Sequence, residues 1–242
     1  MKKSTKLMGA AAIAVGAMLA GGTAQAETDV SFNVGLATDY IFRGVDQTGP
    51  FDEGQAFGGV DATSGSFYAG AWVSNTGASP TNFIEYDLYA GWKPVVGPVT
   101  FELGLIYYGY TDSDLGGNES DLSTYELKAA GSFAAGGVTW GGAIYWTPNF
   151  SGDFDGLDDN GGFYYEVNAA YTFSNNATLS GAIGAADVDD YAVDGYTTWN
   201  IGVTYPVIEH LSIDARYIDT DDDAFFYGYA GDRLVGTLKV TF

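Results

Sequence analysis

Ten charged residues stand at alternate positions within otherwise apolar segments, and they are the first indication of what this chain could do. The ten are Glu85, Asp87, Glu102, Glu126, Lys128, Glu166, Asp214, Arg216, Arg233 and Lys239. Carboxylates fixed along a water-containing passage attract cations, whereas buried carboxylates that meet basic groups form structural ion pairs. Glu126 stands two residues before Lys128, and Asp214 two before Arg216, so each couple shares one face of an extended segment. We expect mainly structural pairing. A selectivity role is the alternative, and the two are compatible because acids outnumber bases.

A further acid and base, Asp39 and Arg43, share a face just beyond the first apolar segment. They are candidates for the mouth of a pore. They could equally hold the connection that follows the segment in place, and the sequence favours neither role.

Aromatic side chains accompany the charges on the same face. They are Tyr68, Trp72, Tyr89, Tyr108, Tyr145, Tyr164 and Tyr196. A row of rings could stack against ring-bearing solutes. In a narrow barrel, however, inward side chains fill the interior, and we expect these rings mainly to fill space.

Catalytic and metal chemistry have little support in the composition. His210 is the only histidine, it falls in a predicted short turn, and the chain has no cysteine, so neither a Ser–His nucleophile pair nor a zinc ligand set can be assembled. Acidic stretches at 112–121, 153–159, 187–194 and 219–223 could hold divalent cations that bridge to lipopolysaccharide phosphates. None has the calcium-loop pattern with its Gly and distal Glu, and ordinary solvation is the better interpretation. We therefore expect no enzyme, no cofactor and no metal.

The segments that carry these residues alternate strictly between apolar and other side chains. Every second residue is apolar from Ile84 to Trp92, and the last segment, from Leu234 to Phe242, keeps the same alternation. This period of two is typical of strands with two unlike faces. We predict twelve strands, whose uncharged faces span 30–36, 56–62, 67–73, 84–92, 99–107, 125–133, 138–146, 163–173, 177–185, 197–205, 211–217 and 234–242. The second of them has the weakest pattern.

Alternation alone does not separate a soluble β-domain from a transmembrane barrel, but the connections do. Short ones are expected at 63–66, 93–98, 134–137, 174–176 and 206–210, and long ones near 38–54, 74–82, 110–121, 147–161, 187–195 and 219–231. Short and long connections alternate, as in outer-membrane barrels with short periplasmic turns and long external loops. Rings expected at strand ends suit the membrane interface: Trp72, Trp92, Tyr107, Tyr110, Trp146, Phe163, Tyr171, Phe173, Tyr205 and Tyr217.

The two ends of the chain and its charge point the same way. Three lysines, an apolar run and Ala24-Gln25-Ala26 read as a secretory signal peptide over residues 1–26, which leaves 27–242 as one domain. The terminal Phe242 lies on the apolar parity, as in bacterial outer-membrane barrels. The net charge of −22 argues against nucleic-acid partners, since those are bound through basic contacts to phosphate.

Three blocks of sequence resemble a known family. VSFNVGLATDYIFRGVDQT begins at Val30, SFYAGAWVSN at Ser66 and EYDLYAGW at Glu85. These blocks and their spacing are similar to the opening of the TorF-family porins of proteobacteria. The resemblance implies an outer-membrane, porin-like protein and names no solute.

We therefore expect an all-β protein, a transmembrane antiparallel up-and-down β-barrel of about twelve strands in the bacterial outer membrane. Its expected activity is passive diffusion of small solutes, with a preference for cations. The alternative is a non-conducting barrel with a structural or surface-interaction role through its acidic loops. Expected partners are outer-membrane lipids, lipopolysaccharide and small solutes, and the sequence leaves the oligomeric state open.

Overall fold

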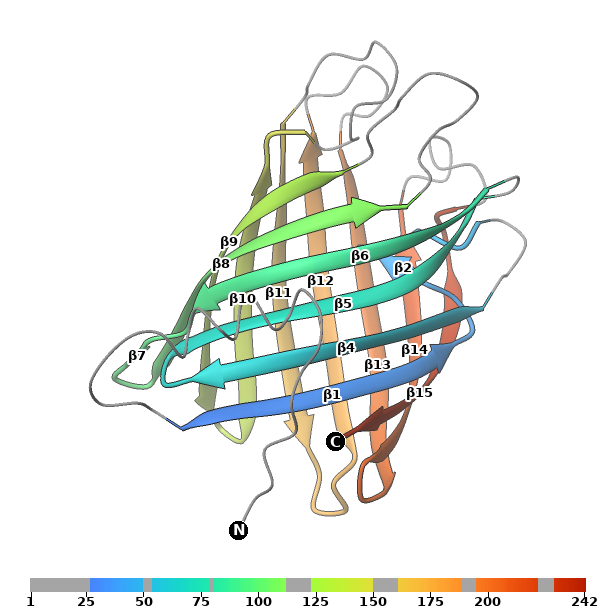
Figure 1. The fold of residues 1–242 in the computed structure, drawn as a ribbon. Coiled ribbons are helices and arrows are strands. Elements are labelled where there is room, and N and C mark those ends of the chain that lie inside the picture. Colours follow the sequence, from blue (N-terminus) through green and yellow to red (C-terminus); the bar gives the residue numbers. More distant parts are fainter. Residues whose placement is uncertain are drawn as a thin grey trace.

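The protein is a closed antiparallel β-barrel (Figure 1). The computed structural model describes residues 27–49, 54–78, 81–111, 123–149, 161–188, 195–221 and 229–242. Within them, twelve long strands form the wall. They are β1 (Thr28–Ala37), β4 (Gln55–Ser64), β5 (Phe67–Ala78), β6 (Thr81–Trp92), β8 (Val99–Tyr110), β9 (Thr124–Ala135), β10 (Val138–Thr147), β11 (Gly162–Thr172), β12 (Thr178–Val188), β13 (Tyr196–Ile208), β14 (Leu211–Thr220) and β15 (Arg233–Thr241). The expected strand number is confirmed, including the weakly patterned second strand, which is β4.

The barrel closes where β1 meets β15. Asn33 pairs with Thr241, and the ladder continues to Ala37 opposite Thr237. Phe242 extends the seam, because its backbone exchanges hydrogen bonds of 2.9 and 3.1 Å with Phe32. An unpaired strand edge has no hydrogen-bonding partner in hydrocarbon, so this seam satisfies the backbone groups that an open sheet would leave exposed.

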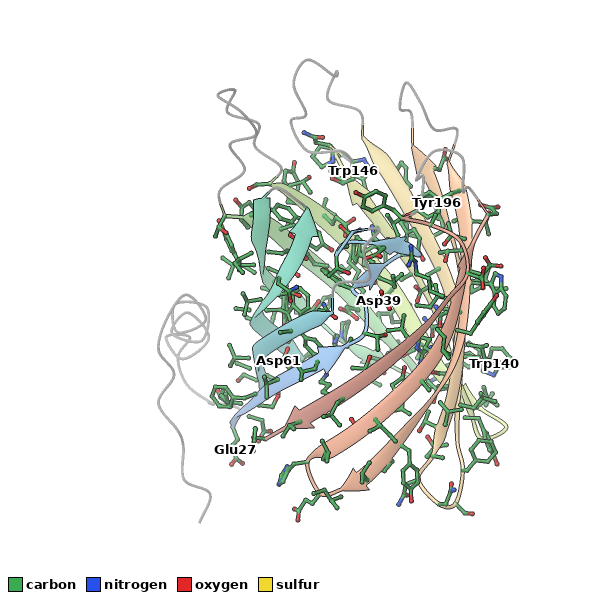
Figure 2. The ribbon with its side chains drawn as sticks, turned by 90° about the vertical axis from the view of Figure 1, so that its right-hand side faces the viewer. Glu27, Asp39, Asp61, Trp140, Trp146 and Tyr196 are labelled. Atoms are coloured by element: carbon green, nitrogen blue, oxygen red, sulfur yellow. The ribbon has the colours of Figure 1, made fainter. Side chains whose placement is uncertain are left out.

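The short connections lie at one end, which we call the turn end, together with Glu27 and Phe242 (Figures 1 and 2). All five expected short turns are confirmed. The one at 93–98 contains a two-residue strand, β7 (Val95–Val96). We call the opposite end, where the other connections begin, the loop end.

The expected long connection at 74–82 is wrong. Strands β5 and β6 run through it, with Ser74 opposite Glu85 and Ala78 opposite Thr81, so residues 79–80 alone separate them. The polar side chains that suggest a loop are inward-facing strand residues: Ser74 and Thr76 are both buried. The central parts of the other long connections, and the predicted signal peptide at 1–26, lie outside the described residues.

The uncharged face of each strand points outward. Leu103, Ile144, Val167 and Leu238 are 43–61% exposed, whereas the side chain of Glu102, beside Leu103, is 15% exposed. The outer wall is therefore apolar and the inner wall polar, as the alternation predicts. None of the described residues forms a helix long and apolar enough to cross a membrane.

Aromatic rings mark both ends of the outer wall. Trp140 lies toward the turn end and Trp146 toward the loop end in Figure 2, and Trp146 packs edge-on against Tyr125. Trp72 is an exception to the predicted interface belt. Its parity turns it into the barrel, where its ring meets Tyr40 with centroids 5.5 Å apart.

Glycines on the inner wall lie beneath several inward aromatic rings. A Cβ at Gly70 would overlap the ring of Tyr89, and one at Gly184 would overlap Tyr164. Strand glycines often permit bending, and aromatic cover of a strand glycine is a recognised sheet device. Here the missing side chain lets a neighbouring ring lie flat against the wall instead of projecting across the lumen.

Candidate functional site

The connection after β1 folds back into the barrel. Residues 39–49, which we call the inward hairpin, contain two short paired strands, β2 (Ile41–Phe42) and β3 (Val45–Asp46). Arg43 and Gly44 form the turn between them with φ values of 51° and 84°. Two successive positive φ angles define the tight I′ type of hairpin turn, which places Arg43 at the tip of the hairpin. Figure 2 places Asp39, at the root of this hairpin, within the outline of the barrel.

One side of the inward hairpin is tied to β5 and β6. The Tyr40 hydroxyl donates a 2.7 Å hydrogen bond to Glu85, and the Gly77 amide of β5 donates to the Gln47 carbonyl at 3.1 Å. Tyr40 is 9% exposed and Glu85 is 2% exposed. The Glu85 carboxylate is thus a buried acceptor that the hairpin satisfies.

The tip of the hairpin reaches β9. The Arg43 guanidinium donates to both oxygens of Glu126, at 2.6 and 2.9 Å, and the two side chains are 9% and 6% exposed. The Tyr108 hydroxyl of β8 donates to the same carboxylate at 2.9 Å. A bidentate, charge-assisted pair of this kind is among the stronger polar contacts in proteins.

The other side of the hairpin is tied to β14 and β15. Thr220 donates to the Gly44 carbonyl at 2.9 Å, and Asp46 lies 3.6 Å from the Arg233 guanidinium. Asp46 also accepts two hydrogen bonds from Thr48, both of 2.8 Å. Burial raises the pKa of the Asp46 carboxyl, and the Thr48 bonds and the charge of Arg233 partly offset that rise.

The inward hairpin therefore bridges opposite walls near the loop end. Of the two roles open to Asp39 and Arg43, the structure gives Arg43 the second, since it fixes the first connection in place. Asp39 lies at the root of the hairpin, and its Oδ1 is buried without a hydrogen-bond partner among the described residues. The sequence analysis missed Tyr40 and Asp46. Gly44, since glycine tolerates a positive φ, was the signal that could have indicated a second, inner hairpin.

A second set of charges lies nearer the turn end, on β8 and β9. Glu102 accepts hydrogen bonds from Tyr68 at 2.6 Å and from Lys128 at 2.9 Å, and Lys93 lies 3.6 Å away. The expected pairing of Glu126 with Lys128 is wrong. Arg43 and Tyr108 occupy the Glu126 carboxylate, and Lys128 reaches across to Glu102 on the neighbouring strand instead.

The expected pairing of Asp214 with Arg216 is confirmed, at 3.2 Å. Arg216 also donates to Asn200 at 2.7 Å and to Ser180 at 2.9 Å. Its guanidinium lies over Gly202, where a Cβ would touch it at 2.9 Å. Arg216 thus runs along the wall across three strands and does not project into the lumen.

Other inner carboxylates have no basic partner within 4 Å among the described residues. Asp61 accepts from Tyr89 at 2.7 Å, Glu166 from Asn168 at 2.9 Å, and one oxygen of Asp87 is buried without a hydrogen bond. Lys239 lies on β15, in register with Gly35 of β1 and Ser212 of β14. The inner wall therefore carries more negative charge than its basic groups neutralise.

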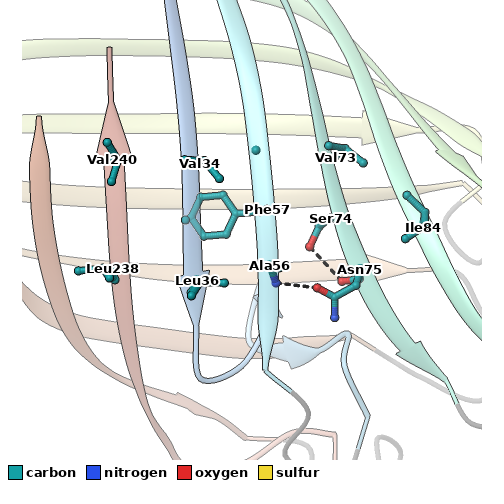
Figure 3. Close-up of a pocket in the computed structure, with 12 residues that line it drawn as sticks. Val34, Leu36, Ala56, Phe57, Val73, Ser74, Asn75, Ile84, Leu238 and Val240 are labelled. Atoms are coloured by element: carbon teal, nitrogen blue, oxygen red, sulfur yellow. Dashed lines mark hydrogen bonds between the residues drawn. The ribbon is translucent and has the colours of Figure 1, made fainter.

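A hollow on the outer wall is a different kind of feature. Val34, Leu36, Val73, Ile84, Leu238 and Val240 surround it (Figure 3). Its polar members are engaged, since Asn75 accepts a 2.6 Å hydrogen bond from the Ala56 amide and Ser74 donates to the Asn75 carbonyl at 2.9 Å. The lining is that of a hydrocarbon-facing wall and offers nothing to a polar solute.

Comparison with known proteins agrees with this geometry. A family described as "Bacterial protein of unknown function (Gcw_chp)" matches residues 21–242. The chain belongs to the Gcw_chp family. No curated protein matches it by sequence.

Solved structures with the same fold include the KdgM porin, with a TM-score of 0.59 and 11% identity over 88% of this chain and 99% of that one. The NanC porin gives 0.57 and 10% over the same shares. A loop-deletion mutant of OmpT, an outer membrane protein of Vibrio cholerae, gives 0.51 and 10% over 89% and 99%. The Gcw_chp chain has the fold of outer-membrane porins.

The described residues contain no group of three or more His, Cys, Asp or Glu side chains placed to hold a metal ion. Most of the acidic stretches considered for divalent cations lie outside them. His210 lies in the turn between β13 and β14, with its Nδ1 2.7 Å from the Thr241 carbonyl.

Proposed function

We propose that this protein is an outer-membrane channel through which small hydrophilic solutes diffuse passively, with a preference for cations. The observation that carries the proposal is the contrast between the two faces of the barrel. The outer wall is apolar, whereas the inner wall holds carboxylates such as Asp61 and Glu166 that have no basic partner within 4 Å among the described residues. Fixed negative charge along a passage concentrates cations and excludes anions.

The fold and the first blocks of the sequence support the channel part of the proposal. The KdgM and NanC structures are described as porins, and the opening segments resemble the TorF-family porins. A signal peptide over residues 1–26 would deliver the chain to the outer membrane, where its apolar wall would contact lipid and lipopolysaccharide.

Transport is a better proposal than catalysis. His210 stands at the turn end, close to Phe242, and far along the wall from the inward hairpin. Two lumen carboxylates at the loop end, Glu85 and Glu126, are engaged as acceptors from Tyr40, Arg43 and Tyr108. Neither arrangement presents a base beside a nucleophile, which covalent catalysis requires.

The reversal potential of the refolded protein in a planar lipid bilayer tests the proposal. With a KCl gradient across the bilayer, stepwise currents should reverse at a potential of the sign that potassium permeation gives. Anion-biased reversal would contradict the cation preference, and a folded protein that never conducts would contradict the channel.

The inward hairpin favours one alternative, a non-conducting barrel with a structural or surface-interaction role. Because the hairpin is tied to β5, β9 and β14, it narrows the lumen at the loop end. A silent wild-type barrel that begins to conduct when Arg43 is replaced would be a closed channel. A barrel that stays silent in both forms would support the structural role.

A further inference from the structure

The side chains of the barrel wall that surround the Arg43 guanidinium form a binding site for that group, which we call the receptor. Glu126 of β9 presents both carboxylate oxygens to the two terminal nitrogens of the guanidinium, at 2.6 and 2.9 Å. The Tyr108 hydroxyl donates to one of those oxygens at 2.9 Å, which fixes the carboxylate. Two parallel N–H···O bonds suit a planar guanidinium, and an ammonium cannot reproduce them.

Two aromatic faces complete this receptor. The Arg43 Cζ lies 4.4 Å from the ring centroid of Tyr145 and 4.4 Å from that of Tyr164. The two rings have centroids 6.1 Å apart and planes inclined by 54°. Aromatic faces attract cations through the ring quadrupole, and guanidinium stacks on them well.

The receptor belongs to the wall and not to the hairpin. Tyr145 and Tyr164 are directly paired residues of β10 and β11, and Tyr164 lies over Gly184 and packs with Ala186 and Tyr196. The ladders of the closed barrel hold these positions whether or not Arg43 is present. Arg43, by contrast, belongs to the two-residue turn of the inward hairpin and reaches the receptor with one long side chain.

We propose that Glu126, Tyr108, Tyr145 and Tyr164 form a binding site for the guanidinium group of small solutes, which the chain's own Arg43 occupies in this structure. Solutes with a guanidinium group compete with Arg43 for the site and release the tip of the inward hairpin. This inference deepens the proposed function, since it names a class of cation that the lumen recognises. The binding step itself requires no current. Tethering gives Arg43 a high effective concentration, so free solutes bind weakly to the wild type and more tightly once Arg43 is removed.

Methylguanidinium binding to the Arg43→Ala protein in detergent micelles tests the site by calorimetric titration. We expect Arg43→Ala to bind methylguanidinium at least about tenfold more tightly than Arg43→Ala/Glu126→Gln. The double variant lacks the carboxylate that accepts two parallel, charge-assisted hydrogen bonds from the guanidinium. Methylammonium, with the same charge and no fork, should bind Arg43→Ala about tenfold more weakly than methylguanidinium.

Arg216→Ala is the matched control, because it vacates a second guanidinium position that has Asp214 and Asn200 but no aromatic ring over the guanidinium among the described residues. It should bind methylguanidinium more weakly than Arg43→Ala. The proposal is overturned if Arg43→Ala binds methylguanidinium no more tightly than the double variant Arg43→Ala/Glu126→Gln. It is also overturned if Arg43→Ala binds methylguanidinium no more tightly than Arg216→Ala.

A second measurement uses the wild type and does not depend on how the variants fold. Millimolar methylguanidinium should accelerate amide hydrogen exchange in residues 40–48, and methylammonium at the same concentration should not. Equal effects of the two salts would contradict the site. Both measurements are made in micelles and require no current. A protein that binds methylguanidinium but does not conduct would contradict the channel and not the binding site. A protein that conducts but does not bind methylguanidinium would contradict the binding site and not the channel.

Discussion

Two arginine–carboxylate pairs inside one barrel behave in opposite ways. Arg43 meets Glu126 near the loop end, where the two side chains are 9% and 6% exposed. Arg216 meets Asp214 nearer the turn end, where they are 23% and 20% exposed. Arg43 comes from a hairpin that crosses the lumen, whereas Arg216 lies along its own wall. The same kind of ion pair narrows the lumen at one level and lies along the wall at another.

The difference lies in what each arginine ties together. Arg43 joins segments 83 positions apart in the chain, and its loss would leave a buried carboxylate without its cation. Arg216 joins neighbouring strands that the backbone ladder already holds. We therefore expect substitutions at the loop end to change conduction and those on the wall to change little.

Arg43→Ala should have the largest effect on the barrel. Without the guanidinium the hairpin tip loses its tie to β9, so we expect single-channel conductance to rise at least about fivefold as the constriction opens. The uncompensated Glu126 should also cost about 3–5 kcal/mol of stability. Bilayer recording in KCl measures the first effect and urea unfolding the second. Arg216→Ala is the control, and an equal rise in its conductance would remove the distinction between the two pairs.

Gly44→Ala should act on the same hairpin through the backbone. Gly44 has φ of 84°, and a Cβ there would overlap Thr220 and Thr198, so the alanine should push the tip away from β13 and β14 and raise conductance. Gly136, in a short turn, also has positive φ, but a Cβ there meets nothing within 4 Å. Gly136→Ala should cost only about 1 kcal/mol and leave conductance unchanged. Identical currents from both variants would show that the Gly44 contact does not hold the hairpin.

Glu102→Gln should change ion preference more than conductance. The substitution removes the acceptor of Lys128 and Lys93 and leaves two cations near the turn end. We expect the ratio of potassium to chloride permeability to fall about twofold, measured from the reversal potential in a KCl gradient. Glu166→Gln removes a carboxylate that has no basic partner within 4 Å among the described residues. It should lower the ratio by at least as much, because the proposed cation preference rests on such carboxylates. An unchanged ratio for Glu166→Gln would contradict that preference.

Asp214→Asn should have the smallest effect. The pair is partly exposed, and Arg216 keeps its bonds to Asn200 and Ser180, so the expected loss of stability is about 1 kcal/mol or less. Urea unfolding of the refolded barrel measures it. A loss as large as that of Arg43→Ala would mean that wall pairs and hairpin pairs are not energetically distinct.

The sequence predicts the wall of this barrel much better than what the wall encloses. Alternation fixes which face of each strand meets hydrocarbon, because charge on that face is costly. It also identifies Glu85 and Glu126 as inward residues. It cannot assign their partners, since an inner side chain meets neighbouring strands and returning segments as readily as its own strand.

The sequence analysis makes one error in the wall and misses one feature inside it. The stretch at 74–82 is predicted as a loop because its inward residues are small and polar, but the structure uses them as strand. The connection expected near 38–54 is present, but the sequence does not show that its Tyr40 and Arg43 turn into the lumen. In both places the inward residues are polar, so alternation between apolar and polar side chains cannot distinguish strand from loop.

The glycines beneath the inner rings have a consequence for how such a pore can diverge. At Gly70 or Gly184 an added methyl group would lift a tyrosine off the wall and narrow the bore, with no change in net charge. The width of the lumen can therefore change at these two glycines while the charges on its wall stay the same.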